Sequence, residues 1–380
     1  MILWPLFWFF GLIAILALMA PAMFALVKAF FFIRKRKNAL PLDWIITGLT
    51  VILIAFFYFI NYMAIQNVWH WMSELNIYED HIELLYAERQ ETWEQFRPFG
   101  HNTRTITADF ETDLVITTDY PRLDGATAFL PVYSTVAETV YSGLDANTAR
   151  SYISLSTTSQ AFEQLMRGNA DIIFTLQPSP AQIEEARAIG IEFNKTPIFR
   201  EAFVFFVNDT NPITGLTAEQ IRQIYTGSIT NWRDVGGHDA EIAAYQRNAN
   251  SGSQTIMEQV VMNGLTMVTP ATELREGTMG MMLRAVAQYS NHERALGYSF
   301  RYYSTVMNPQ EGLRLLAVDD IAPTPENIAN DRYPFTVDVY AITTDHALEN
   351  PNTQAVIDWL VSEQGKRLIE QVGYISLATP

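Results

Sequence analysis

Two long stretches with almost no charge open the chain, and they restrict what its first 65 residues can become. Residues 1–33 contain one charged side chain, Lys28, and residues 44–65 contain none. A helix of about 20 apolar residues is long enough to cross the hydrocarbon core of a bilayer, which is about 30 Å thick. We therefore predict a two-helix transmembrane hairpin over residues 1–65, with spans at about 2–33 and 44–65.

The segment between the two stretches predicts the orientation of this hairpin. It reads Arg34-Lys35-Arg36-Lys37. Short loops rich in lysine and arginine stay in the cytoplasm. We therefore expect a multi-pass protein of the cell membrane, with two spans and with the soluble part after Ile65 on the extracytoplasmic side. The lipid bilayer is then a partner of the chain, and a cleaved signal peptide is disfavoured because a second span follows the first.

The charge balance limits the ligands of the soluble part. Residues 1–65 carry five basic side chains and one acidic side chain, whereas the whole chain has a net charge of −16, so the remainder carries about −20. Nucleic-acid binding needs a basic surface and is not expected. Any anion site must be local and built from oriented donors. The chain has no cysteine, which excludes disulfides, thiol catalysis and cysteine-based zinc sites. We predict no cofactor and no metal site.

The sequence after the hairpin predicts a spacer and then an α/β body. Residues 66–112 are expected to form a juxtamembrane helix, followed by a linker from Phe99. The expected strands are 113–118, 152–155, 170–174, 202–207, 243–245, 295–300 and 337–342. The expected helices are 131–141, 159–167, 183–189, 217–225, 256–262, 279–289, 352–363 and 365–372. Short apolar strands that alternate with helices indicate an α/β architecture with largely parallel sheets.

Three turns rich in hydrogen-bond donors each follow an expected strand and precede an expected helix. They are Asp124–Thr127, Ser156–Ser159, and Arg247 with Ser251–Ser253. Helix starts present backbone N–H groups without internal partners, and hydroxyls and a guanidinium add further donors. Each turn alone is more often an ordinary helix cap. The three together favour a cradle for an oxyanion, because such turns converge at the carboxyl ends of strands.

Evidence for catalysis is thin. The chain contains no Gly-x-Ser-x-Gly elbow, no His-Glu-x-x-His and no phosphate loop. We predict no catalytic residue and no enzyme activity.

Two segments carry a resemblance to a known family. Residues 224–237 read Ile-Tyr-Thr-Gly-Ser-Ile-Thr-Asn-Trp-Arg-Asp-Val-Gly-Gly, and Arg247-x-x-x-Ser251-Gly252-Ser253 follows at the expected interval. This pattern resembles the phosphate-binding proteins of phosphate ABC importers, over about residues 113–380. The resemblance implies a two-lobed type II periplasmic-binding-protein fold. Its first lobe would comprise 113–202 and 336–380, and its second lobe 203–335, with a hinge near residues 200–203 and 334–337.

The resemblance also implies a set of ligand-binding residues. They are Gly125, Ala126, Thr127, Thr158, Ser159, Arg247, Ser251, Gly252 and Ser253, and the further candidates are Asp124, Arg200 and Glu201. One position departs from the family pattern. The family places an aspartate shortly after the third strand, where this chain has Leu176. Either Asp124 or Glu201 takes its place in the cleft, or the specificity has changed. For Arg200–Glu201 the alternative is a surface ion pair.

The predicted function is therefore that of an extracytoplasmic, membrane-tethered solute-binding protein for phosphate or a related oxyanion. Its partner would be the membrane subunits of an ABC importer. Two alternatives remain open: a membrane-coupled oxyanion sensor or scaffold, and a phosphatase that uses the same cleft with Ser251.

Overall fold

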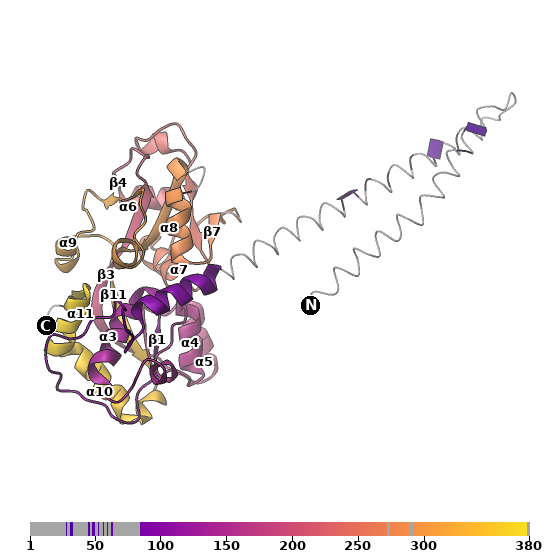
Figure 1. Ribbon diagram of the computed structural model, residues 1–380. Coiled ribbons are helices and arrows are strands. Elements are labelled where there is room, and N and C mark those ends of the chain that lie inside the picture. Colours follow the sequence, from indigo (N-terminus) through magenta and orange to yellow (C-terminus); the bar gives the residue numbers. More distant parts are fainter. Residues whose placement is uncertain are drawn as a thin grey trace. The chain divides into compact units, whose positions relative to one another are not determined.

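The computed structural model describes residues 84–271, 274–288 and 292–377, together with isolated positions between residues 28 and 63 (Figure 1). The chain divides into two units, residues 1–84 and 85–380. The two expected spans lie outside the described residues except for those isolated positions. No helix in the described part of the chain is both long enough and apolar enough to cross a membrane.

A helix over residues 84–96 leads into the second unit, and we call it the N-terminal helix. Its Trp93 and Phe96 side chains are buried, whereas Leu84 and Tyr86 are exposed. Residues 97–112 follow without helix or strand. The expected juxtamembrane helix is thus present from residue 84 onward, and the expected linker begins close to Phe99.

The main sheet has the strand order β1-β2-β11-β3-β8-β5. Its strands are β1 (Leu123–Gly125), β2 (Ile172–Thr175), β3 (Asn194–Asn208), β5 (Ala243–Ala244), β8 (Ala295–Phe300) and β11 (Thr336–Thr343), and β9 (Leu313–Leu315) and β12 (Ile375–Ser376) also pair with β3. Two small sheets pair β4 (Gly215–Leu216) with β10 (Ala317–Val318) and β6 (Gln246–Arg247) with β7 (Arg275–Glu276).

The expectation of largely parallel sheets is wrong for the centre of the molecule. Strand β3 pairs antiparallel with β8, β9, β11 and β12, whereas only β1 with β2 and β5 with β8 are parallel in the main sheet. The expected strands at 113–118 and 152–155 are also wrong, because each makes a single bridge, Ile116 to Tyr141 and Leu123 to Ile153. Strand formation depends on neighbours in space more than on local residue preference.

The helices agree more closely with the sequence pattern. They are α3 (Leu130–Val140), α4 (Thr158–Met166), α5 (Pro180–Ala188), α6 (Ala218–Tyr225), α7 (Gly252–Ile256), α8 (Met279–Gln288), α9 (Pro325–Ala329), α10 (Pro351–Val361) and α11 (Glu363–Val372). Thr217 and Gln220 form the expected capping box of α6. Two helix starts differ from the expected ones. The helix expected from Ile256 begins at Gly252, because Ser251 caps it, and the helix expected from Ile183 begins at Pro180, because Ser179 caps it.

Strand β3 runs through both lobes of the second unit. Its residues 194–202 pair with β11, and its residues 203–207 pair with β8. We call lobe one the part built around β1, β2 and β11 with α3, α4, α5, α10 and α11, and lobe two the part around β8 with α6, α7 and α8 (Figure 1). Where β3 passes between them, the rings of Phe203 and Tyr298 lie 5.2 Å apart and are fully buried.

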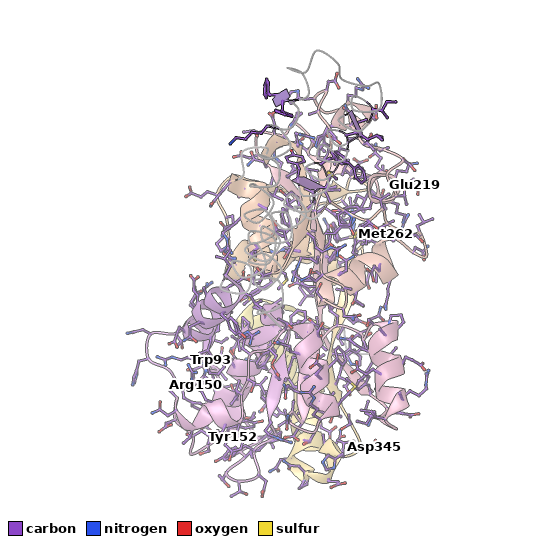
Figure 2. The ribbon with its side chains drawn as sticks, turned by 90° about the vertical axis from the view of Figure 1, so that its right-hand side faces the viewer. Trp93, Arg150, Tyr152, Glu219, Met262 and Asp345 are labelled. Carbon is purple, nitrogen blue, oxygen red and sulfur yellow. The ribbon has the colours of Figure 1, made fainter. Side chains whose placement is uncertain are left out.

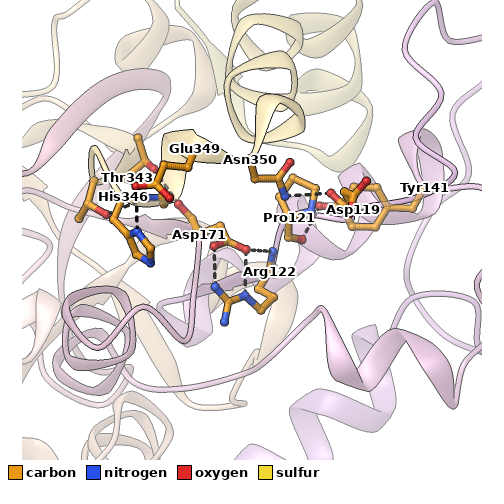
Figure 3. Close-up of polar contacts among 11 residues, drawn as sticks. Asp119, Pro121, Arg122, Tyr141, Asp171, Thr343, His346, Glu349 and Asn350 are labelled. Atoms are coloured by element: carbon orange, nitrogen blue, oxygen red, sulfur yellow. Dashed lines mark hydrogen bonds and ion pairs between the residues drawn. The ribbon is translucent and has the colours of Figure 1, made fainter.

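A charge-assisted contact fixes the part of lobe one where β1 and β2 begin (Figure 3). The Arg122 guanidinium donates to both carboxylate oxygens of Asp171, at 2.9 and 2.7 Å, and the Arg122 backbone N–H donates at 2.7 Å. Thr343 of β11 donates to the Asp171 carbonyl at 2.8 Å. The hydrogen bond and the negative charge of Asp171 raise the pKa of Arg122. This contact is structural, since neither charged residue lines the cavity described below.

Candidate functional site

The three donor-rich turns converge on one small cavity in the second unit, about 50 Å³ in volume. On the same scale a water molecule needs roughly 10–15 Å³. The cavity therefore suits a few waters or one small solute. It is lined by Leu85, Glu88, Arg89, Ala126, Thr127, Thr157, Thr158, Arg247, Ser251, Gly252, Ser253, Gly277, Thr278, Met279 and Phe300. Seven of the nine residues implied by the family resemblance are among them.

The first turn follows β1 and depends on a glycine. A β-carbon at Gly125 would lie 2.4 Å from the carbonyl oxygen of Phe174, so only glycine fits beside β2. The Ala126 N–H then donates to that carbonyl at 2.9 Å. Thr127 begins a short 3-10 turn and lines the cavity with Ala126. Gly125 does not line the cavity, and its role is to let the turn pack.

The second turn is the start of α4. Thr157 caps this helix by accepting a hydrogen bond from the Gln160 N–H, and both Thr157 and Thr158 line the cavity. Ser159 does not line it. Its hydroxyl instead donates to the backbone carbonyl of Asn250 at 2.8 Å, which joins lobe one to lobe two.

The third turn precedes α7 and lies close against the second. Asn250 has a left-handed backbone with φ of 61°, a conformation that asparagine tolerates better than most residues. Ser251 caps α7 by accepting from the Gln254 N–H at 3.3 Å. A β-carbon at Gly252 would lie only 2.8 Å from the Thr158 hydroxyl, so glycine allows the two turns to approach.

Arg247 supplies the positive charge. The residue is 9% exposed, and its guanidinium donates to the carbonyl oxygens of Glu276 and Gly277, both at 3.0 Å, and to the Ser253 hydroxyl at 3.4 Å. Burial lowers the pKa of Arg247. No carboxylate of the described residues lies within ion-pair distance of it. The Glu88 and Glu276 carboxylates act on it from further away. A buried cation without a direct ion pair is costly, and an anion in the cavity would offset part of that cost.

Two acids that were candidates for the cleft do not line the cavity. Asp124 points one oxygen at the backbone N–H groups of Gly125 and Ser156, at 2.8 and 2.9 Å, and burial raises its pKa. Glu201 accepts from the Ala202 and Tyr302 N–H groups at 2.8 and 3.2 Å. Both acids therefore accept hydrogen bonds from backbone donors inside the protein, and neither is among the residues that line the cavity.

The remaining candidates are also placed by the structure. Arg200 pairs with Asp331 at 2.7 Å and with Asp338 at 3.6 Å, and it does not line the cavity. The alternative of a surface ion pair between Arg200 and Glu201 is wrong, because Glu201 is buried and accepts from backbone N–H groups. Leu176 is fully buried. Its side chain lies behind the third turn, 3.5 Å from the point where a β-carbon on Gly252 would sit.

Sequence reasoning missed the contribution of the N-terminal helix. Glu88 and Arg89 line the cavity, and Glu88 is the one acid among the lining residues. The residue pattern of this helix predicts a spacer, and nothing in it indicates a cleft. Thr157, Gly277 and Thr278 were missed as well, although Thr157 belongs to the expected serine- and threonine-rich turn.

The described residues contain no group of three or more histidine, aspartate or glutamate side chains that could hold a metal ion. The chemistry of the cavity lining is that of hydroxyls, backbone amides and charges, which suits an anion.

Comparisons with known proteins agree with this chemistry. Residues 117–364 match the PBP superfamily domain. The phosphate-binding protein PstS of Borreliella burgdorferi is 26% identical over 183 residues, which cover 47% of this chain and 64% of that protein. The protein SphX of Synechococcus elongatus is 22% identical over 67% of this chain and 76% of its own length. This chain thus spans a little under two thirds of the Borreliella protein.

Solved structures show the same fold. An ABC-type phosphate transport receptor from Vibrio cholerae matches with a TM-score of 0.50 and 25% identity, over 68% of this chain and all of that one. A Clostridium perfringens protein crystallised with bound phosphate matches with a TM-score of 0.53 and 23% identity, over the same shares. The expected type II two-lobed fold is therefore confirmed for the second unit.

Proposed function

This chain belongs to the PBP superfamily, and we propose on that premise that it binds phosphate or a related oxyanion for an ABC importer. The relatives are named as binding proteins, which supports binding rather than catalysis. In this proposal the chain is tethered to the cell membrane by its first 65 residues and holds the ligand on the extracytoplasmic side. Lobe one comprises residues 113–202 and 336–380, and lobe two residues 203–335.

One observation carries the proposal: Arg247 is buried beside the cavity with no described carboxylate within ion-pair distance, and donor-rich turns from both lobes surround the same space. The guanidinium supplies full charge, and the hydroxyls and helix-start amides supply directional donors. Thr127 and Thr158 come from lobe one, whereas Ser251, Gly252 and Ser253 come from lobe two. A ligand held by both groups would favour the closed arrangement.

Calorimetric titration of the purified full chain with phosphate, sulfate and molybdate tests whether the cavity beside Arg247 binds an oxyanion. Arg247→Ala should cost about 2–5 kcal/mol of phosphate binding free energy, because it truncates a buried charged donor. Arg247→Lys should recover only part of the lost phosphate binding free energy, since lysine keeps the charge but lacks the planar guanidinium with its paired donors. Arg233→Ala is the matched control, because that arginine is exposed and pairs with Asp239. Equal phosphate affinity in folded wild type and Arg247→Ala would exclude the site.

A second candidate function is a membrane-coupled oxyanion sensor. The observation in its favour is that the N-terminal helix, which begins at residue 84 at the start of the second unit, lines the cavity with Glu88 and Arg89. If the chain is a sensor, its deletion should change phosphate-dependent gene expression while phosphate uptake stays intact. If it serves an importer, uptake should fall.

A further inference from the structure

The Glu88 carboxylate occupies a built anion site at the edge of the cavity. It accepts from the Thr278 hydroxyl at 2.5 Å, from the Gly280 backbone N–H at 3.2 Å and from the Tyr303 hydroxyl at 2.8 Å. Arg284 lies 3.6 Å away, and the Glu88 side chain is 11% exposed. These donors surround the start of α8, where backbone N–H groups favour negative charge. The carboxylate therefore fills a place suited to an oxyanion.

The N-terminal helix that carries Glu88 is attached to both lobes. On lobe one, Arg89 donates to Gln160 at 2.9 Å, and Arg150 lies over the Trp93 ring at 5.2 Å, where Figure 2 shows the two labelled side chains close together. Its contact with lobe two at the cavity is Glu88 itself, through α8 and Tyr303. Loss of the Glu88 contacts would remove the hydrogen bonds of the helix to α8 and Tyr303, while Thr92 and Phe96 would still lie beside Tyr303 and Met307.

The backbone of α8 is shaped for this carboxylate. A β-carbon at Gly280 would lie 2.5 Å from one Glu88 oxygen and 2.9 Å from the other. Glycine at this position thus permits the carboxylate to reach the helix start. A helix otherwise prefers alanine to glycine by up to about 1 kcal/mol, so the glycine is not explained by helix stability.

An oxyanion in the cavity and the Glu88 carboxylate share one space and carry charge of the same sign. Both face the field of Arg247, and like charges within a few ångström repel strongly in a partly buried site. We infer that Glu88 is an internal competitor of the ligand: an oxyanion that enters the cavity displaces the carboxylate and breaks the hydrogen bonds that hold the N-terminal helix to Thr278, Gly280 and Tyr303. This inference rests on the proposed function, and it gives the helix a means to report whether the site is filled.

The test compares phosphate binding by the full chain and three variants. Glu88→Gln removes the competing charge, and Gly280→Ala pushes the carboxylate away while keeping its charge. Both should tighten phosphate binding, Glu88→Gln by about tenfold, since the variant relieves repulsion between close like charges. Glu91→Gln is the matched control, because it makes the same charge change on an exposed residue of the same helix that does not line the cavity.

Hydrogen exchange of the amides of residues 85–96 gives an independent readout. Saturating phosphate should speed their exchange in wild type, and in Glu88→Gln exchange should already be fast without phosphate. Weaker phosphate binding by Glu88→Gln, or an affinity equal to wild type, would overturn the inference while leaving the proposed function in place. If neither wild type nor Glu88→Gln binds any of the oxyanions, both the inference and the proposed function fail.

Discussion

At the scale of single residues, the buried charges divide into those that serve the fold and those that face the cavity. Asp171 is satisfied by Arg122, and Glu201 is satisfied by two backbone N–H groups. Arg247 differs, because its guanidinium reaches carbonyl oxygens and one hydroxyl but no described carboxylate. The absence of a direct ion pair at Arg247 is what favours an anion in the cavity under the proposed function.

Glu201 gives a prediction about pH. Burial raises its pKa from 4.5 to about 7. Because the folded-state pKa lies above that of the unfolded chain, the stability linked to this group is fully present below about pH 4.5 and is lost as the pH rises through about 7. A shift of this size corresponds to about 3 kcal/mol. The free energy of unfolding of wild type, measured with urea, should therefore fall between these pH values by more than that of Glu201→Gln. Parallel pH profiles of the free energy for the two proteins would contradict this prediction.

At the scale of elements, serine and threonine cap both helices whose first turn lines the cavity and helices whose first turn does not. Thr217 and Ser179 form capping boxes that close the starts of α6 and α5 on themselves. Thr157 and Ser251 cap α4 and α7 in the same local way, but their turns face the cavity. The capping hydrogen bond is decided within four residues, whereas the cavity needs two turns from different lobes to meet.

A substitution at Thr217 tests whether helix capping can be changed without changing the cavity. Thr217→Ala should lower the free energy of unfolding by about 1 kcal/mol, because it removes the side-chain acceptor of an N-cap. It should leave phosphate affinity unchanged, since α6 does not reach the cavity. Thr217→Ser keeps the hydroxyl and should restore most of the stability in urea unfolding. A loss of phosphate affinity in Thr217→Ala would show that α6 influences the site.

At the scale of the whole molecule, two features act together. Strand β3 passes from lobe one to lobe two, and β11 pairs with its first part, so motion between the lobes must bend the chain near residues 202–203 and 335–336. The net charge of −16 meanwhile opposes the approach of an anion to either lobe. The site must therefore attract its ligand locally, through Arg247 and the turns, against the field of the rest of the protein.

The association rate of phosphate should show this repulsion. Raising the ionic strength from about 0.01 to 0.15 M shortens the Debye length from about 30 to 8 Å and should increase the association rate by roughly two- to fivefold. Stopped-flow tryptophan fluorescence of the full chain measures the rate. A rate that falls with added salt would mean that a local positive field dominates the approach.

Helix positions were predictable because their signals are local, whereas the hinge was expected only from the family resemblance, and the hinge and the ligand-binding residues stay predictions. Thr217 with Gln220 marks a helix start, and the alternation of apolar strands with helices marks the α/β body. Arg247 and the glycine-containing turns carry donors that can be recognised from neighbouring residues. The strand direction was predicted less well, since β3 pairs antiparallel with strands that follow it by about 90 to 180 residues, and nothing local determines that order.

The sequence by itself determined the donors of the site: hydroxyls, helix-start amides and one arginine, each set by its neighbours in the chain. Only the tertiary structure decided which side chains share the cavity. In the folded chain Ser159 donates a hydrogen bond from lobe one to lobe two, and Asp124 and Glu201 accept from backbone amides. Glu88 accepts from the start of α8, about 190 residues away in the sequence. The physical reason is that a hydrogen bond within one turn needs only local geometry, whereas a cavity exists only where distant surfaces are packed together.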